Sequence, residues 1–173
     1  MDTTTIFAVQ FVLSLVIFSL AARWYFAPWL MGKPTKDALS LLLLPHAFRH
    51  IGLVFLVPGL VGENLPRDFA AGAAYGDFAS GLLALASIFA LRGEFRLALV
   101  LVVVTNIVGV VDLAVALSQA TVIPQLGVAW FIPTFIVPVL LVTHGMMLSR
   151  LYCMARRRFV PYAGRSSTHE AAS

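Results

Sequence analysis

The chain has 173 residues, of which 60% are hydrophobic and 12% are charged, with a formal net charge of +4. Its mean hydropathy is +0.92. Soluble domains are typically about 45–50% apolar and about 25% charged, so this composition excludes a water-soluble globular enzyme, a disordered chain and a disulfide scaffold. One cysteine, Cys153, allows neither an intramolecular disulfide nor a multi-cysteine zinc site. The composition therefore predicts an all-α integral membrane protein.

Five apolar segments follow one another along the chain. Each is long enough to cross a hydrocarbon core of about 30 Å as a helix, whereas isolated strands cannot cross lipid. The first segment has no basic residue before it, so it is interpreted as a retained helix and not as a secretory signal. We expect a five-helix transmembrane bundle in a single domain over residues 1–158, with spans at about 6–22, 38–61, 69–91, 97–117 and 127–149.

The distribution of basic residues predicts the orientation. Of the twelve Lys and Arg residues, ten fall on one side of this five-span arrangement, Arg67 falls on the other, and Arg49 lies within a span. Basic loops stay in the cytoplasm, so the N-terminus is expected outside and the C-terminus inside a cell membrane of the bacterial inner-membrane type. Residues 159–173 are small and polar, and we expect them to form a disordered cytoplasmic tail.

Three charged residues lie within the predicted spans. Arg49 is near the middle of the second span, where a guanidinium that faces lipid costs about 2.5–3.5 kcal/mol. We therefore expect it to turn into the bundle, toward Asp77 on the third span and Asp112 on the fourth. Two carboxylates beside one guanidinium leave an excess negative charge. A low-dielectric site resists that excess unless an aspartate is protonated, or a histidine or bound cation supplies the missing charge.

Histidines accompany these charges. His46 and His50 are four residues apart, so they are predicted to share one helix face beside Arg49, and His144 on the fifth span lies at a depth similar to that of His46. Imidazole binds transition metals and haem, so His46 and His144 are candidate ligands for either. The predicted buried polar cluster consists of His46, Arg49, His50, Asp77, Asn106, Asp112 and His144.

Three functions are compatible with this cluster. The first is the handling of protons, ions or a small polar solute by a multi-pass inner-membrane protein that forms a homo-oligomer. The second is a haem- or metal-binding membrane redox protein. The third is a non-catalytic assembly or interaction subunit, in which the ion pairs and interhelical hydrogen bonds are structural. We assign no catalytic residue, because the chain carries no Walker, GxGxxG, HExxH or CxxC motif. The net positive charge of a membrane protein is usually a topology signal, so we expect the lipid bilayer as the surroundings and no nucleic-acid partner.

Overall fold

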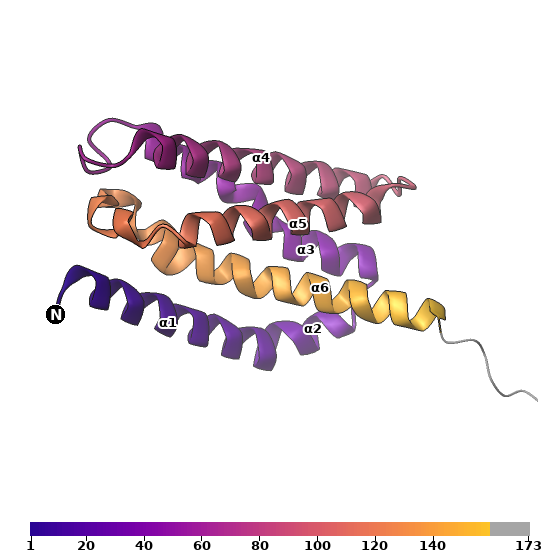
Figure 1. The fold of residues 1–173 in the computed structure, drawn as a ribbon. Helices are drawn as coiled ribbons and strands as arrows, with labels where there is room; N and C mark the ends of the chain where they lie inside the picture. The colour runs from indigo at the N-terminus through magenta and orange to yellow at the C-terminus, as the bar shows by residue number, and fades with distance from the viewer. Residues whose placement is uncertain (160–173) are drawn as a thin grey trace, which may run out of the picture.

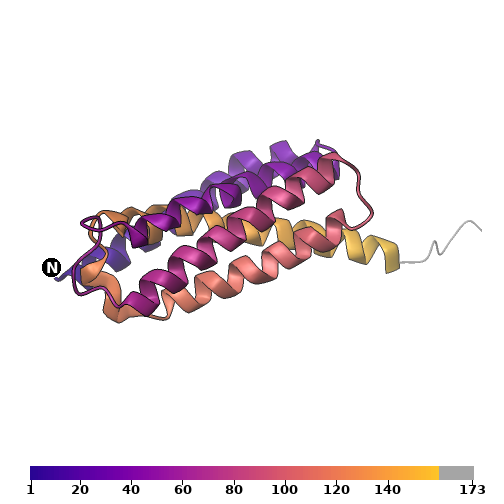
Figure 2. The ribbon, with the colours of Figure 1, turned by 90° about the horizontal axis from the view of Figure 1, so that it is seen from above.

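The structure is a computed structural model that describes residues 1–159, and over that range it contains helices and no strand. The helices run alongside one another as an elongated bundle, with the N-terminus at one end and the end of the last helix at the other (Figures 1 and 2). Residues 160–173, which include most of the predicted tail, lie outside the described residues. The prediction of an all-α chain with five helices long and apolar enough to cross a membrane is confirmed: Thr3–Met31, Thr35–Leu56, Arg67–Arg92, Ala98–Leu117 and Gly127–Arg156.

The first long helix is built from three consecutive pieces. These are α1 (Thr3–Ala21), the π-helical turn η1 (Ala22–Phe26) and α2 (Ala27–Met31). The Asp2 side chain caps α1 by accepting a hydrogen bond of 2.6 Å from the backbone N–H of Thr5. Hydrogen bonding with the side chain and the backbone of Thr5 lowers the pKa of Asp2. No residue of α1 is buried. This helix therefore lies at the side of the bundle, next to the last helix (Figure 1).

The second long helix changes its pitch halfway. It begins as α3 (Thr35–Ala47), which contains Pro45, and continues as the 3₁₀-helix η2 (Phe48–Leu56). The helix thus ends at Leu56, before the predicted limit of the span at Val61. A 3₁₀-helix has three residues per turn, and its side chains eclipse at i and i+3. The residues of this row that are buried are His46, Arg49, Gly52 and Phe55.

The third and fourth long helices, α4 (Arg67–Arg92) and α5 (Ala98–Leu117), form an antiparallel hairpin. Helix α4 packs against α3 and η2 on one side and against α5 on the other. The hydroxyl groups of Ser87 and Thr105, 2.9 Å apart, link the two helices of the hairpin. Because α4 lies in the middle of this arrangement, its small residues decide how closely its neighbours approach.

The last part of the chain is irregular before it becomes an α-helix. Its loop is held against the loop that precedes α4, because the N–H of Val128 donates to the carbonyl of Leu60 at 2.8 Å, and the N–H of Gly62 donates to that of Gln125 at 2.8 Å. These contacts close the end of the bundle at which the chain starts. The pieces are η3 (Ala120–Gln125), η4 (Gly127–Trp130), η5 (Ile132–Ile136) and α6 (Val137–Phe159).

Candidate functional site

Arg49 forms the centre of the candidate site, and its side chain is fully buried. Its Nε donates a hydrogen bond of 2.7 Å to Oδ1 of Asp77, and its Nη2 donates to Oδ2 of Asp112. Its Nη1 donates to the carbonyl of Gly109 at 3.3 Å. Charge-assisted bonds of this kind are stronger than neutral ones. They join η2 to both α4 and α5, so the structure brings together the three charged residues singled out in the sequence.

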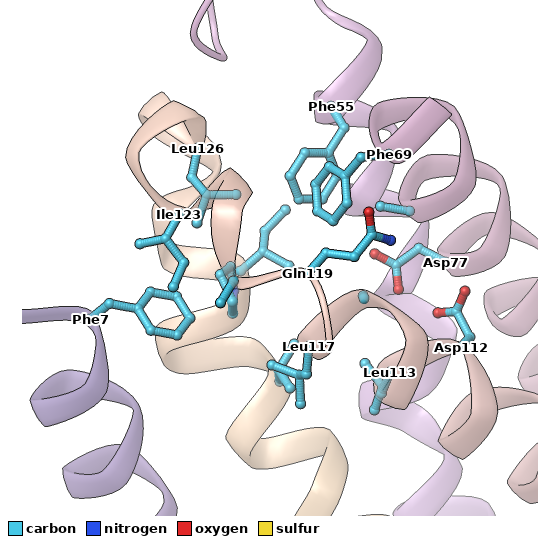
Figure 3. A pocket seen from close by; sticks show the side chains of 16 residues that line it. Phe7, Phe55, Phe69, Asp77, Asp112, Leu113, Leu117, Gln119, Ile123 and Leu126 are labelled. Carbon is cyan, nitrogen blue, oxygen red and sulfur yellow. The ribbon is translucent and has the colours of Figure 1, made fainter. Parts of the chain in front are cut away.

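The two carboxylates also border a cavity. Its volume is about 70 Å³, which is enough for several water molecules. Figure 3 shows Asp77 and Asp112 together on one side of it. Their side chains are 11% and 19% exposed, while Arg49 behind them is covered completely. The remaining walls are mainly apolar and include Phe7, Phe55, Phe69, Ile123 and Leu126.

The cavity lies in the half of the bundle that carries the N-terminus, since its lining comes from the start of α1, the end of α5 and the segment from η3 to η5. Gln119, just after α5, contributes a polar side chain to the same lining (Figure 3). The site is thus a cavity large enough for water, with mainly apolar walls, and the carboxylates of Asp77 and Asp112 form its floor. Its polar groups converge from α4 and α5, with the guanidinium from η2 beneath them.

Three glycines make the space that these side chains occupy. A Cβ added at Gly52 would lie 2.6 Å from Cβ of Asp77, and a Cβ at Gly76 would collide with the carboxylate of Asp112. A Cβ at Gly109 would lie 2.7 Å from Nε2 of His144 and 3.0 Å from Nη1 of Arg49. Any larger residue at these positions therefore displaces a charged or polar group of the site. The available sequence signal is a glycine inside an apolar helix near a charge, and it does not reveal which side chain fills the space.

Two histidines lie directly behind the guanidinium. His46 from α3 and His144 from α6 are buried, and their ring centres are 4.1 Å apart with an angle of 54° between the planes. His144 also approaches Arg49, because both reach the same point above Gly109. The polar groups consequently form one continuous cluster, from the carboxylates at the cavity to the imidazoles deeper in the bundle.

The hydrogen-bond partners of both rings favour one tautomer for each. Nδ1 of His144 is 3.0 Å from Oδ1 of Asn106, an acceptor, so that nitrogen carries the proton. Nε2 of His46 is 2.9 Å from the hydroxyl of Thr143, whose own proton is donated to a backbone carbonyl, so Nε2 of His46 also donates. The other nitrogens, Nδ1 of His46 and Nε2 of His144, carry lone pairs. Neither has a hydrogen-bond partner within residues 1–159.

His50 does not belong to this cluster. Its side chain is exposed, and its Nδ1 lies 3.1 Å from the carbonyl of Ala47. The prediction that His46 and His50 share a face is wrong because it assumed α-helical geometry through both residues. The change to three residues per turn at Phe48 turns His50 outward and aligns Arg49 with His46 instead.

The histidine pair does not fit a haem. Axial imidazoles bind from opposite faces of the macrocycle and point their nitrogens at the iron, whereas the rings of His46 and His144 contact each other at 4.1 Å. Within the described residues, no group of three or more His, Cys, Asp or Glu side chains is placed to hold a metal ion. The guanidinium of Arg49, which approaches the same point above Gly109 as His144, repels a cation. The predicted ligand pair therefore lacks the surroundings that a transition metal requires.

The chain belongs to the family described as Domain of unknown function (DUF8737), whose model matches residues 6–152. No curated protein and no solved structure matches the chain. The family match contains every residue of the cluster, from His46 to His144. The description of the family names no activity, so a function has to be argued from the geometry of the site.

Proposed function

We propose that this chain is a multi-pass protein of a bacterial-type inner membrane that takes up protons, or another small cation, through the cavity into the buried cluster. The observation that carries the proposal is the floor of the cavity, where Asp77 and Asp112 share the single guanidinium of Arg49. Two negative charges and one positive charge leave a net charge of −1. One proton or one monovalent cation neutralises the site, and a low-dielectric environment favours that neutral state.

The carboxylates are arranged to accept such a charge. Arg49 binds Oδ1 of Asp77 and Oδ2 of Asp112, so each aspartate keeps a second oxygen that is not bound by the guanidinium. The guanidinium stays charged, because arginine is not deprotonated in proteins, and it fixes the position of both acids. Asp77 and Asp112 are then the titrating or cation-binding groups, and Arg49 is the fixed charge that positions them.

The histidine pair provides a second group that can bind a proton. Nδ1 of His46 and Nε2 of His144 are buried acceptors without a partner in the described chain, and they lie next to the charged group. Beyond them, toward the opposite end of the bundle, a fully buried apolar layer contains Leu39, Leu43, Val102 and Met147. The cluster thus borders the cavity on one side. On the other side, this layer separates it from the end of the bundle opposite the N-terminus. Such one-sided access suits a site that is loaded from one face of a membrane.

The distribution of basic residues supports an orientation for this uptake. Ten of the twelve Lys and Arg residues belong to the half of the bundle opposite the N-terminus or to the tail, and by the positive-inside rule that half faces the cytoplasm. The cavity would then open on the outer side. Because five helices are few for a complete translocation pathway, we also propose that the chain functions as a homo-oligomer.

The test is proton and cation flux into liposomes that contain the purified protein. Asp77→Asn and Asp112→Asn should each abolish flux driven by a pH gradient. Asp68→Asn is the matched control, because this exposed aspartate lies at the start of the same helix as Asp77 and outside the cavity. Parallel arms with Na⁺ or K⁺ gradients identify the cation. Unchanged flux of every cation in both site variants would defeat the proposal.

A structural role for the cluster is the second candidate, and a specific observation favours it. Every nitrogen of the Arg49 guanidinium has an acceptor, from Asp77, Asp112 and Gly109, so the network alone can fix the order of η2, α4 and α5. In that case the protein is an assembly or interaction subunit. A variant with leucine at all three charged positions would then retain its membrane localisation and its partners. Loss of function in a folded triple variant contradicts this alternative.

A further inference from the structure

A second, larger hollow lies away from the cluster. It has a volume of about 1140 Å³ and runs between the first long helix and α6, in the half of the bundle opposite the N-terminus. Nearer the N-terminus, the first long helix contacts η4 and η5, which precede α6: Nε1 of Trp130 donates to Oε1 of Gln10, and the rings of Phe18 and Phe135 pack edge to face. The lining of the groove starts at Leu15 on the first long helix and at Leu141 on α6.

The inner part of the groove is mainly apolar, with Ser19 as a polar lining residue. Leu15, Leu141, Val142 and Met146 line it, and Gly145 leaves a gap in its wall, since a Cβ at this position meets no atom of the described chain within 4 Å. From Leu15 to the first basic residue along this wall is a distance of about 12 Å on a helix. This length of apolar wall suits a hydrocarbon chain better than a compact polar ligand.

The outer part of the groove is basic. Arg23, Lys33 and Arg150 line it, and no acidic side chain is among the lining residues of the described chain. Nζ of Lys33 lies 4.2 Å from the ring centre of Trp29, which holds the ammonium at the rim. Arg150 donates one bond through Nη2 to the carbonyl of Leu30, so most of its five N–H donors stay free for another acceptor.

We propose that this groove binds one anionic phospholipid, with its phosphate between Arg23, Lys33 and Arg150 and an acyl chain along Leu15, Leu141 and Val142. Basic pockets between membrane helices on the cytoplasmic side have the right chemistry for acidic head groups. The inference rests on the placement of the chain in a membrane, but not on uptake of a cation by the cluster. The two can therefore fail independently.

Native mass spectrometry of protein released from vesicles of equimolar phosphatidylglycerol and phosphatidylcholine tests the proposal. The wild type should retain one phosphatidylglycerol molecule in preference to phosphatidylcholine. Arg23→Gln with Lys33→Gln should lower that preference by about fivefold for each basic side chain removed. The matched control is Arg92→Gln with Arg96→Gln, which removes two exposed basic residues at the same end of the bundle and outside the groove.

Gly145→Leu tests the apolar part, because its side chain fills the gap without meeting an atom of the described chain at its Cβ. It should reduce retention of the lipid while the protein stays folded. The proposal is overturned if the wild type shows no preference for phosphatidylglycerol, or if the groove and control variants lose it equally. It is also overturned if millimolar inorganic phosphate displaces the lipid completely, or if Gly145→Leu instead converts dimers into monomers, which would identify a second copy as the occupant.

Discussion

Replacing Gly109 with alanine tests whether the packing of the charged cluster is as tight as the structure indicates. The new Cβ would lie 2.7 Å from Nε2 of His144 and 3.0 Å from Nη1 of Arg49, so at least one of these buried groups has to move. Forcing an extra methyl group into a packed interior costs about 1–3 kcal/mol. Against this, alanine is favoured over glycine inside a helix by about 0.5–1 kcal/mol. We therefore expect a net destabilisation of about 1–2 kcal/mol.

A matched glycine separates the contact from the helix propensity. Gly72 is also inside a long helix, but a Cβ there meets no atom of the described chain within 4 Å. Gly72→Ala should therefore stabilise the protein by about 0.4–1 kcal/mol. The difference between the two variants, about 1–3 kcal/mol, isolates the clash with the cluster. Gly76→Ala, which would collide with the carboxylate of Asp112, should behave like Gly109→Ala.

The assay is reversible unfolding in mixed micelles, followed by the loss of helical circular dichroism as the denaturing detergent increases. Proton flux measured on the same preparations shows whether displacement of Arg49 and His144 also impairs uptake. If Gly109→Ala and Gly72→Ala change the free energy of unfolding equally, the guanidinium and the imidazole do not meet above Gly109. The described geometry of the cluster would then be refuted.

Four further changes follow from the same structure. Arg49→Gln should destabilise the protein by about 3–5 kcal/mol, because it leaves two buried carboxylates without a counter-charge. Asp112→Asn should cost less than about 1 kcal/mol, since asparagine still accepts a hydrogen bond and the cluster becomes neutral. If Arg49→Gln and Asp112→Asn lower the free energy of unfolding in micelles equally, this reasoning is contradicted. Asn106→Leu should cost about 1–3 kcal/mol in the same assay by leaving a buried imidazole donor unpaired, whereas no loss would place that donor elsewhere. The Lys36 ammonium, 2.5 Å away, holds the pKa of Glu94 below its ordinary value of 4.5, so this carboxylate stabilises the fold above that pH and progressively less as the pH falls. Glu94→Gln should therefore flatten the acid side of the stability profile, and an unchanged slope would show that the pair contributes nothing.

The sequence predicts the long helices well because their signal is local. A run of about twenty apolar residues bounded by turn residues is sufficient to place a helix that can cross a membrane. Charge and depth are also readable in this way: an arginine in the middle of such a run must find an acid, and the chain offers Asp77 and Asp112 on the next two helices. The charged residues of the cluster are thus predicted from the energetic cost of a charge in the membrane, and no recognised motif is needed.

The details of the site depend on geometry that the sequence pattern does not specify. The long 3₁₀ segment after Ala47 decides that Arg49 turns inward and His50 outward, and a run such as Phe48–Leu56 is apolar enough to be either type of helix. The need for glycine at positions 52 and 109 cannot be predicted from the sequence pattern either, since it depends on which side chains approach these positions from other helices. The cavity is formed by segments from both ends of the chain, so no single stretch of sequence indicates it.

The most direct test of the account is proton flux in liposomes after the cavity is filled. Ala116 lines the cavity without taking part in the Arg49 network, so Ala116→Phe blocks access while the charges remain in place. Ala114→Phe, at an exposed position on the same helix, is the control. We expect Ala116→Phe to abolish proton flux and Ala114→Phe to retain it. Full flux through correctly folded Ala116→Phe would contradict uptake through this cavity.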